Sequence, residues 1–154
     1  SALSRRCSGF DSPSDRHLIM NIVILSLLIL CYSLVLGIIF AQILLTAPVV
    51  FKVLDNQNAS NFLRKIFPRY YLLLLLITLI ALLVSYLFFQ QTDVYFALTA
   101  VCFSFLGYII IPLTNTARDR GWERLFKFFH NLSVFNTLVI LVISITQIVR
   151  VTYL

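Results

Sequence analysis

Residues 70–89, YYLLLLLITLIALLVSYLFF, form a run of twenty residues without a single charged side chain. An α-helix rises about 1.5 Å per residue, so about 20 residues cross the hydrocarbon layer of a bilayer. Lipid offers no hydrogen-bond partner to the backbone, and a helix satisfies every backbone group within the segment. The run therefore predicts a transmembrane helix.

Three further apolar runs have the same character, at residues 21–47, 94–113 and 131–149. The whole chain of 154 residues is 60% hydrophobic and only 12% charged, which is more apolar surface than one soluble domain of this size can bury. We therefore expect an all-α fold, an integral membrane four-helix bundle formed by residues 20–154.

Residues 1–19 differ from the rest in composition, with five serines and three arginines. This composition predicts a disordered segment. Met20 is the only methionine and directly precedes the first apolar run, so the segment is either a non-native extension or a basic tail. The first run is too long for a cleaved signal sequence, and we expect it to be retained.

Lys and Arg are distributed unevenly between the predicted connections. Four lie between the first and second runs (Lys52, Arg64, Lys65, Arg69), four lie between the third and fourth (Arg118, Arg120, Arg124, Lys127), and the connection between the second and third has none. The positive-inside rule then predicts cytoplasmic basic connections and both termini outside, in a bacterial inner membrane. Each basic residue attracts anionic lipid by about 1 kcal/mol, so membrane lipids are the expected partners. No compact basic domain is left over to predict nucleic-acid binding.

Two connections show local order of their own. Residues 59–67 place their apolar side chains on one face, which predicts a short amphipathic interfacial helix between the first two transmembrane helices. We expect Asn56 or Asn58 to cap it and Pro68 to turn the chain into the second span. Gly121 is the expected start or hinge of the fourth helix.

Small and polar residues recur at helical spacing in three of the four runs. They are Ser33, Gly37 and Ala41 in the first, Ala97, Ala100, Ser104 and Gly107 in the third, and His130, Ser133, Thr137, Ser144 and Gln147 in the fourth. Such stripes let helix backbones approach closely, so they predict the packing faces of the bundle.

Polar residues also gather near the cytoplasmic helix ends. The candidate ligand-binding residues are Gln42, Arg69, Asn115, Arg118, His130 and Asn136. Together they predict a polar site for an anion or a lipid headgroup. No Asp or Glu lies within the four predicted spans, so we do not expect proton coupling through an intramembrane carboxylate.

Signatures of catalysis and of metal binding are lacking in the sequence. It has no HExxH motif, no CxxC pair, no glycine-rich phosphate loop and no Ser/His/Asp constellation. His130 stands alone at its depth, and we expect no catalytic residue, no metal and no cofactor. Haem is an alternative that requires a second histidine from a partner chain. Cys31 and Cys102 are expected to act as small apolar residues.

Four stretches together resemble landmarks of a known family. They are AQILLTAPVVFKVLD (41–55), FPRY (67–70), IPLTNTARDRG (111–121) and FFHNLSVFNTLVI (128–140). In this order they resemble the uncharacterised four-helix membrane domain family that includes transmembrane protein 205. The resemblance covers nearly all of the chain from Met20 onward and implies a four-helix integral membrane protein.

The same stretches are distantly similar to copper-resistance D-like membrane proteins and to a membrane protoporphyrinogen oxidase. That similarity implies metal or haem chemistry, but this chain lacks the additional intramembrane histidines. Our first expectation is a non-enzymatic accessory or assembly subunit, or a homo-oligomer, that associates with other membrane subunits or with itself. The alternative is a transporter or ligand-binding protein with the cytoplasmic polar site, and haem or metal binding is a third.

Overall fold

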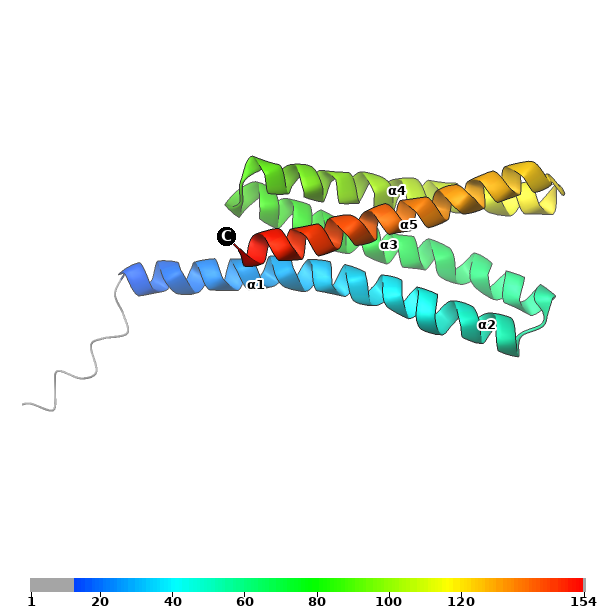
Figure 1. Ribbon diagram of the computed structural model, residues 1–154, viewed down its shortest axis with the longest axis horizontal. Helices are drawn as coiled ribbons and strands as arrows, with labels where there is room; N and C mark the ends of the chain where they lie inside the picture. Colours follow the sequence, from blue (N-terminus) through cyan, green and yellow to red (C-terminus); the bar gives the residue numbers. More distant parts are fainter. Residues whose placement is uncertain (1–12, 154) are drawn as a thin grey trace, which may run out of the picture.

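Residues 13–153 are described in the structure, a computed structural model (Figure 1). The elements are α1 (Pro13–Phe40), the π-helix η1 (Ala41–Thr46), α2 (Ala47–Val53), α3 (Asn56–Phe88), α4 (Gln91–Asp119) and α5 (Glu123–Thr152). In this part of the chain, four helices are long and apolar enough to cross a membrane, the first of them running from Arg16 to Val53 through α1, η1 and α2. The predicted all-α four-helix membrane bundle is confirmed.

The four helices run antiparallel along one long axis. Figure 1 shows the links α2–α3 and α4–α5 at one end and the α3–α4 link with the C-terminus at the other. We name the first the basic end, because it carries Lys52, Arg64, Lys65, Arg69, Arg118, Arg120, Arg124 and Lys127. The opposite end is named the Arg150 end, after the only basic residue in the last turn of α5.

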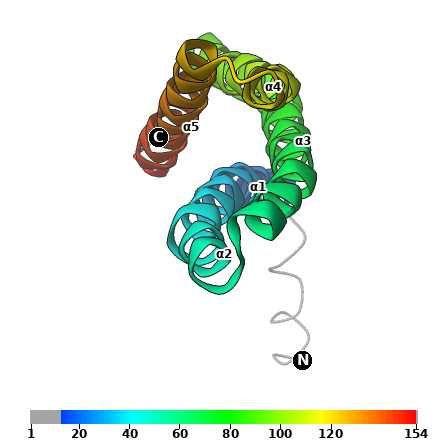
Figure 2. The ribbon, with the colours of Figure 1, turned by 90° about the vertical axis from the view of Figure 1, so that its right-hand side faces the viewer.

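Neighbouring helices pack in the order α1, α3, α4, α5, and α1 also packs against α5. In the described part of the chain, neither η1 nor α2 packs against α5. Figure 2, which looks onto the basic end, shows α2 standing away from α5 there. The helices therefore form a closed bundle over part of their length and an open one at the basic end.

The first helix is longer than predicted at both ends. Residues 13–19 form its first turns, so the disorder predicted for this part of the tail is wrong, and the prediction for residues 1–12 lies outside the described residues. At the other end the helix continues as η1, where the Ala47 N–H donates to the Gln42 carbonyl five residues back. Pro48 has no N–H to donate and its ring crowds the carbonyl of Leu44, which accounts for the widened turn.

The predicted interfacial helix is not a separate element. Residues 56–88 form one helix, α3, with Pro68 inside it, so the predicted turn at Pro68 is wrong. Part of the apolar face of residues 59–67 packs into the bundle: Ala59 is buried and Leu63, Ile66 and Phe67 are half-buried, whereas Phe62 is exposed. The cap also differs from the prediction, because the Asp55 side chain accepts a hydrogen bond from the Asn58 N–H.

The interior is narrow because small residues line it. Ala97, Ala100, Ser104 and Gly107 of α4 are all buried, as their spacing predicted. The equivalent prediction for α1 is wrong, because Ser33, Gly37 and Ala41 are exposed. Instead α1 buries its larger side chains, Leu28, Tyr32, Val35 and Ile39, since they fill the wider space beside α3 and α5.

Gly121 lies in the link between α4 and α5, where the sequence predicts a hinge. Its φ is +67°, a left-handed conformation that glycine adopts without a steric penalty. The Trp122 N–H reaches back to the Ala117 carbonyl at 2.9 Å, and the Gly121 N–H to the Arg118 carbonyl at 3.1 Å. These bonds satisfy carbonyls at the C-terminus of α4 and reverse the chain direction within three residues.

Candidate functional site

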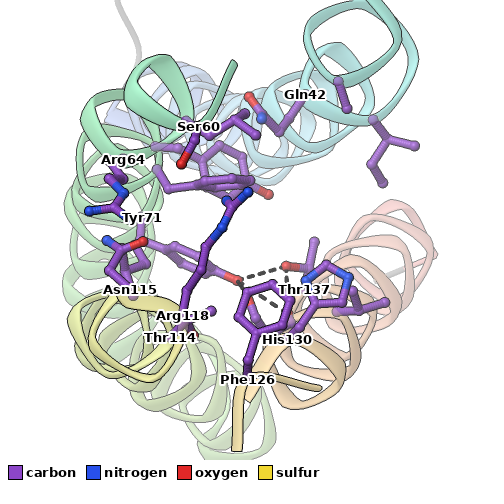
Figure 3. A pocket seen from close by; sticks show the side chains of 18 of the residues that line it. Gln42, Ser60, Arg64, Tyr71, Thr114, Asn115, Arg118, Phe126, His130 and Thr137 are labelled. Carbon is purple, nitrogen blue, oxygen red and sulfur yellow. Dashed lines mark hydrogen bonds between the residues drawn. The ribbon is translucent and has the colours of Figure 1, made fainter. Parts of the chain in front are cut away.

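A cavity of about 380 Å³ lies at the basic end of the bundle (Figure 3). Side chains from η1, α2, α3, α4 and α5 surround it: η1 contributes Gln42, α3 contributes Arg64 and Tyr71, and α4 and α5 contribute Arg118 and His130. Its volume lies within the range of roughly 300 to 1,000 Å³ that small-molecule sites occupy. The cavity exists because α2 and α5 diverge here.

The structure brings four of the six predicted site residues together. Gln42, Asn115, Arg118 and His130 all line the cavity. Arg69 does not line it and is exposed on α3.

Asn136 is the second predicted site residue outside the cavity lining. It is fully buried below the cavity, where its Nδ2 donates to the Phe103 carbonyl at 2.8 Å. Two of the predicted residues therefore belong elsewhere in the fold.

The lining residues Arg64, Tyr70 and Tyr71 are not among the residues that the sequence predicts for the site. Arg64 falls on the polar face of the predicted interfacial helix, and it reaches the cavity because α3 is continuous. Tyr70 and Tyr71 open the apolar run of α3 and give no pattern that separates them from ordinary interfacial aromatics. The sequence signal for this part of the site is the pair of adjacent tyrosines at the start of the apolar run of α3.

The floor of the cavity is a hydrogen-bonded group of hydroxyls centred on Tyr71. Its hydroxyl lies 2.9 Å from Thr137 Oγ1 and 3.1 Å from Ser133 Oγ, and it donates to the Ser133 carbonyl at 3.2 Å. These bonds join α3 to α5 across the bundle and fix the ring orientation. The ring of Tyr71 also forms an edge contact with Tyr70, with 5.0 Å between the centroids.

Arg118 and His130 both contact the ring of Phe126. The guanidinium carbon of Arg118 lies 5.8 Å from the ring centroid, and the imidazole of His130 stacks on the ring with 6.0 Å between centroids. Figure 3 shows Arg118 extending from α4 into the cavity. Within residues 13–153, neither Arg118 nor His130 has a carboxylate partner.

An ion pair between Arg64 and Asp119 joins α3 to α4 at the cavity mouth. Both side chains are partly exposed, so solvent screens the pair and it contributes little to stability. Asp119 engages the terminal nitrogens of Arg64, and the Nε of Arg64 is buried without a partner among the described residues. Arg64 therefore keeps one N–H without a partner among the described residues.

Two more polar groups of the lining lack partners in the described part of the chain. They are Gln42 Nε2 and the Tyr70 hydroxyl, and both atoms are buried. Together with Arg64 Nε, all three groups are able to donate a hydrogen bond, and leaving such donors unpaired costs about 1 to 3 kcal/mol each. All three atoms are enclosed by protein, so the charged groups of the lining that a ligand reaches are the exposed Arg118 and His130.

A second polar cluster occupies the Arg150 end. Asp93 is fully buried in the first turn of α4, and its Oδ1 lies 3.4 Å from both Nε and Nη2 of Arg150. Gln147 Nε2 donates to the Asp93 carbonyl at 3.4 Å. The expectation that no carboxylate lies within a span is wrong, because α4 begins at Gln91 and carries Asp93 into the bundle.

Four long apolar helices joined by short links define a multi-pass α-helical membrane protein with a ligand-sized cavity at one end. Residues 30–123 match the family model of a domain of unknown function, DUF4149. The chain belongs to the DUF4149 family. No curated protein and no solved structure matches the chain. The matched residues include Gln42, Arg64, Asp93 and Arg118, and the closer likeness to transmembrane protein 205 stays a prediction.

Proposed function

We propose that the protein binds an amphiphile with an anionic head, a phosphate or a carboxylate, in the cavity at the basic end. The observation that carries the proposal is the exposed guanidinium of Arg118, which extends into the cavity beside the His130 imidazole and has no carboxylate partner within residues 13–153. An anionic head accepts several hydrogen bonds at once, and Arg binds such groups with two parallel N–H bonds. A bound head would pair the guanidinium of Arg118.

The remaining walls of the cavity suit a hydrocarbon tail. They are formed by Ile43, Ala47, Phe51, Leu63, Phe67, Ile111, Val134 and Leu138. Since neither η1 nor α2 packs against α5, the cavity has a side on which no helix closes it. An acyl chain can enter there from the bilayer while its head stays at the level of Arg118.

Charge favours the same class of ligand. The lining holds two guanidinium groups and one imidazole, and its described residues include no Asp, Glu or Cys. A cavity with this balance attracts anions and repels cations. If the basic end faces the cytoplasm, as the positive-inside rule predicts, the ligand belongs to the cytoplasmic leaflet.

Lateral association receives less support as the primary role. The small residues of α4 pack inside the protomer, against α3 and α5, and are not available to another chain. The small residues Ser33, Gly37 and Ala41 of α1 are exposed, so they are the stripe on which an association with another chain would have to rest. We keep the non-enzymatic expectation, because the lining offers donors and cations but no paired nucleophile and base.

The test compares two arginines at the same end of the bundle. Arg118 lines the cavity, whereas Arg120 lies two residues further on and stacks on Trp122 at 4.8 Å. Purified protein in phosphatidylcholine nanodiscs is titrated with a fluorescent phosphatidic acid. We expect R118A to weaken binding about tenfold or more, since a hydrogen bond to a charged group contributes about 1.5 to 3 kcal/mol.

The R120A variant is the matched control and should bind like the wild type. Equal weakening by both variants would mean that only general charge attraction acts, and would overturn the proposal. A neutral diacylglycerol with the same acyl chains distinguishes head recognition from tail recognition. Diacylglycerol should bind the wild type more weakly than phosphatidic acid does. It should bind R118A as weakly as it binds the wild type.

A further inference from the structure

The segment formed by η1 and α2, residues 41–53, is held loosely in the described bundle, and we name it the arm. No residue of η1 is buried, and among the described elements η1 packs only against α1 and α2, its neighbours in the chain. In α2 only Val50 is buried, and α2 packs against α3 but not against α5. Segments with so little buried surface move at a low cost in free energy.

Both ends of the arm interrupt the regular helix. At its start the Ala47 N–H donates to the Gln42 carbonyl, and Thr46 Oγ1 donates to the Ala41 carbonyl at 3.3 Å, each five residues back. At its end the backbone of Leu54 is extended, with a ψ of 143°. Irregular turns of this kind absorb changes in backbone dihedral angles. The arm is therefore a short helical piece between two hinges.

The arm forms one wall of the cavity at the basic end. It contributes Gln42, Ile43, Ala47 and Phe51 to the lining. Val134 and Leu138 of α5 belong to the same lining, and about half of each side chain is exposed. Figure 3 shows Gln42 on one side of the cavity and the α5 residues His130 and Thr137 on the other. Two largely apolar walls thus face each other without contact between their helices.

Phe51 is the bulkiest residue that the arm brings to the cavity. Its side chain lines the cavity and is nevertheless 67% exposed. Lys52 follows it directly, and basic residues at helix ends lie at the level of the lipid headgroups, where water is present. Removing a phenyl ring from water is favourable. A movement of the arm toward α5 that buries Phe51 is therefore favoured once a ligand fills the space between the walls.

We propose that the arm is a lid that closes toward α5 over the tail of a bound amphiphile. The inference rests on the proposed function, because the tail is what fills the space between the two walls. The structure shows the open position, in which a ligand exchanges with the bilayer through the side that no helix closes. Closure places Ile43, Ala47 and Phe51 on the tail and slows its release.

A disulfide between the arm and α5 would report closure directly. In the described part of the chain, no Cα atom of α2 lies within 8 Å of one of α5, and a disulfide requires Cα atoms less than about 7 Å apart. Tyr32 of α1 lies beside Gln147 of α5, and this register of antiparallel helices puts Ala47 and Val134 at nearly the same depth. Cysteines at these two positions can therefore cross-link only when the arm moves.

The experiment compares cross-linking with and without an anionic lipid. Cys7, Cys31 and Cys102 are replaced by alanine, Ala47→Cys and Val134→Cys are introduced, and the protein is oxidised in phosphatidylcholine nanodiscs. We expect phosphatidic acid to accelerate cross-linking about tenfold or more, since a ligand that prefers the closed position shifts the population toward it in proportion to that preference.

The matched control pairs Val134→Cys with Val49→Cys. Val49 lies on the same helix as Ala47, but it is exposed and outside the cavity lining. This pair should cross-link slowly, with or without phosphatidic acid. Equal acceleration of both pairs would mean that α2 moves without a defined closed position, and would overturn the lid.

Release kinetics give a second test that needs no cysteine. Phe51→Ala should raise the dissociation rate of fluorescent phosphatidic acid about fivefold or more, since differences in affinity at one site arise mostly in dissociation. Val53→Ala is the control, because Val53 is exposed and does not line the cavity. It should dissociate like the wild type.

The outcomes separate the lid from the proposed function. Binding of phosphatidic acid without faster cross-linking of the Ala47→Cys/Val134→Cys pair, or with unchanged release from Phe51→Ala, would overturn the lid alone. No binding of phosphatidic acid by the wild type would overturn the proposed function and the lid with it.

Discussion

Gly107 of α4 lies so close to the ring of Tyr71 on α3 that a Cβ atom at position 107 would overlap the ring. Tyr71 in turn holds Ser133 and Thr137 of α5 through its hydroxyl. Because Gly107 has no side chain, α3 and α4 approach each other closely at the cavity floor, and Tyr71 links both to α5. The cavity and its packing depend on the same pair of residues.

Gly107→Ala should therefore destabilise the bundle. The added methyl must displace the Tyr71 ring, and overpacking of this kind costs about 1 to 3 kcal/mol. Gly37→Ala is the matched control, since no atom of the described chain lies within 4 Å of its Cβ position. It should be neutral or slightly stabilising, because Ala favours a helix over Gly by up to about 1 kcal/mol. Thermal unfolding in detergent, followed by circular dichroism, measures both. Equal melting temperatures for the two variants would contradict the close packing.

Gly121 in the α4–α5 link should resist substitution for a different reason. There is open space around its Cβ position, but its φ of +67° penalises any residue with a side chain. Gly121→Ala should cost about 1 to 2 kcal/mol through the backbone alone. Gly121→Asn should cost less, because Asn tolerates this conformation better than Ala does. The order of unfolding temperatures, wild type above Asn above Ala, checks this.

The cap of α3 should give a small pH dependence at acid pH. The hydrogen bond from the Asn58 side chain, helped by backbone N–H groups, lowers the pKa of the exposed Asp55 carboxyl. A lowered folded-state pKa means that the stabilisation is present above the unfolded pKa, about 3.9, and is lost as the pH falls through the folded value. Asp55→Asn keeps a good cap without a charge and should remove this dependence. Thermal unfolding of both proteins is measured between about pH 6 and pH 3, a range that includes the unfolded Asp pKa. The unfolding temperatures of wild type and Asp55→Asn should approach each other as the pH falls.

Breaking the Arg64–Asp119 pair should change ligand binding more than stability. Asp119→Asn weakens a partly exposed, solvent-screened pair and should change the free energy of unfolding little. It also frees the guanidinium of Arg64 at the cavity mouth and removes a negative charge there. We expect tighter binding of phosphatidic acid. Unchanged or weaker binding, measured in the nanodisc titration, would mean that Arg64 does not face the ligand.

The sequence predicts the membrane bundle because its evidence is local. Twenty uncharged residues specify a span wherever they occur, and Gly121 specifies a link by its backbone alone. The face that each helix buries is a tertiary property, and here the prediction fails for Ser33, Gly37 and Ala41. Their spacing matches that of the buried stripe on α4, but α1 faces a wider gap that larger side chains fill.

The site was predictable in part for the same reason. Gln42, Asn115, Arg118 and His130 converge because they lie near the basic ends of their own helices. Arg64 reaches the site only because α3 continues through Pro68, which breaks the usual rule for proline. Asp93 directly precedes the predicted span 94–113, and a charge next to an apolar run normally marks the membrane surface. Its burial depends on Arg150, more than fifty residues away.

Photocrosslinking tests the proposed lipid cavity most directly. A phosphatidic acid with a photoreactive group on its acyl chain is irradiated with the protein in nanodiscs, and mass spectrometry locates the adducts. We predict adducts on cavity residues such as Leu63, Phe67 and Leu138, and their loss in R118A but not in R120A. Adducts confined to outward-facing residues such as Leu44 and Leu45, in all three proteins alike, would contradict the proposed site.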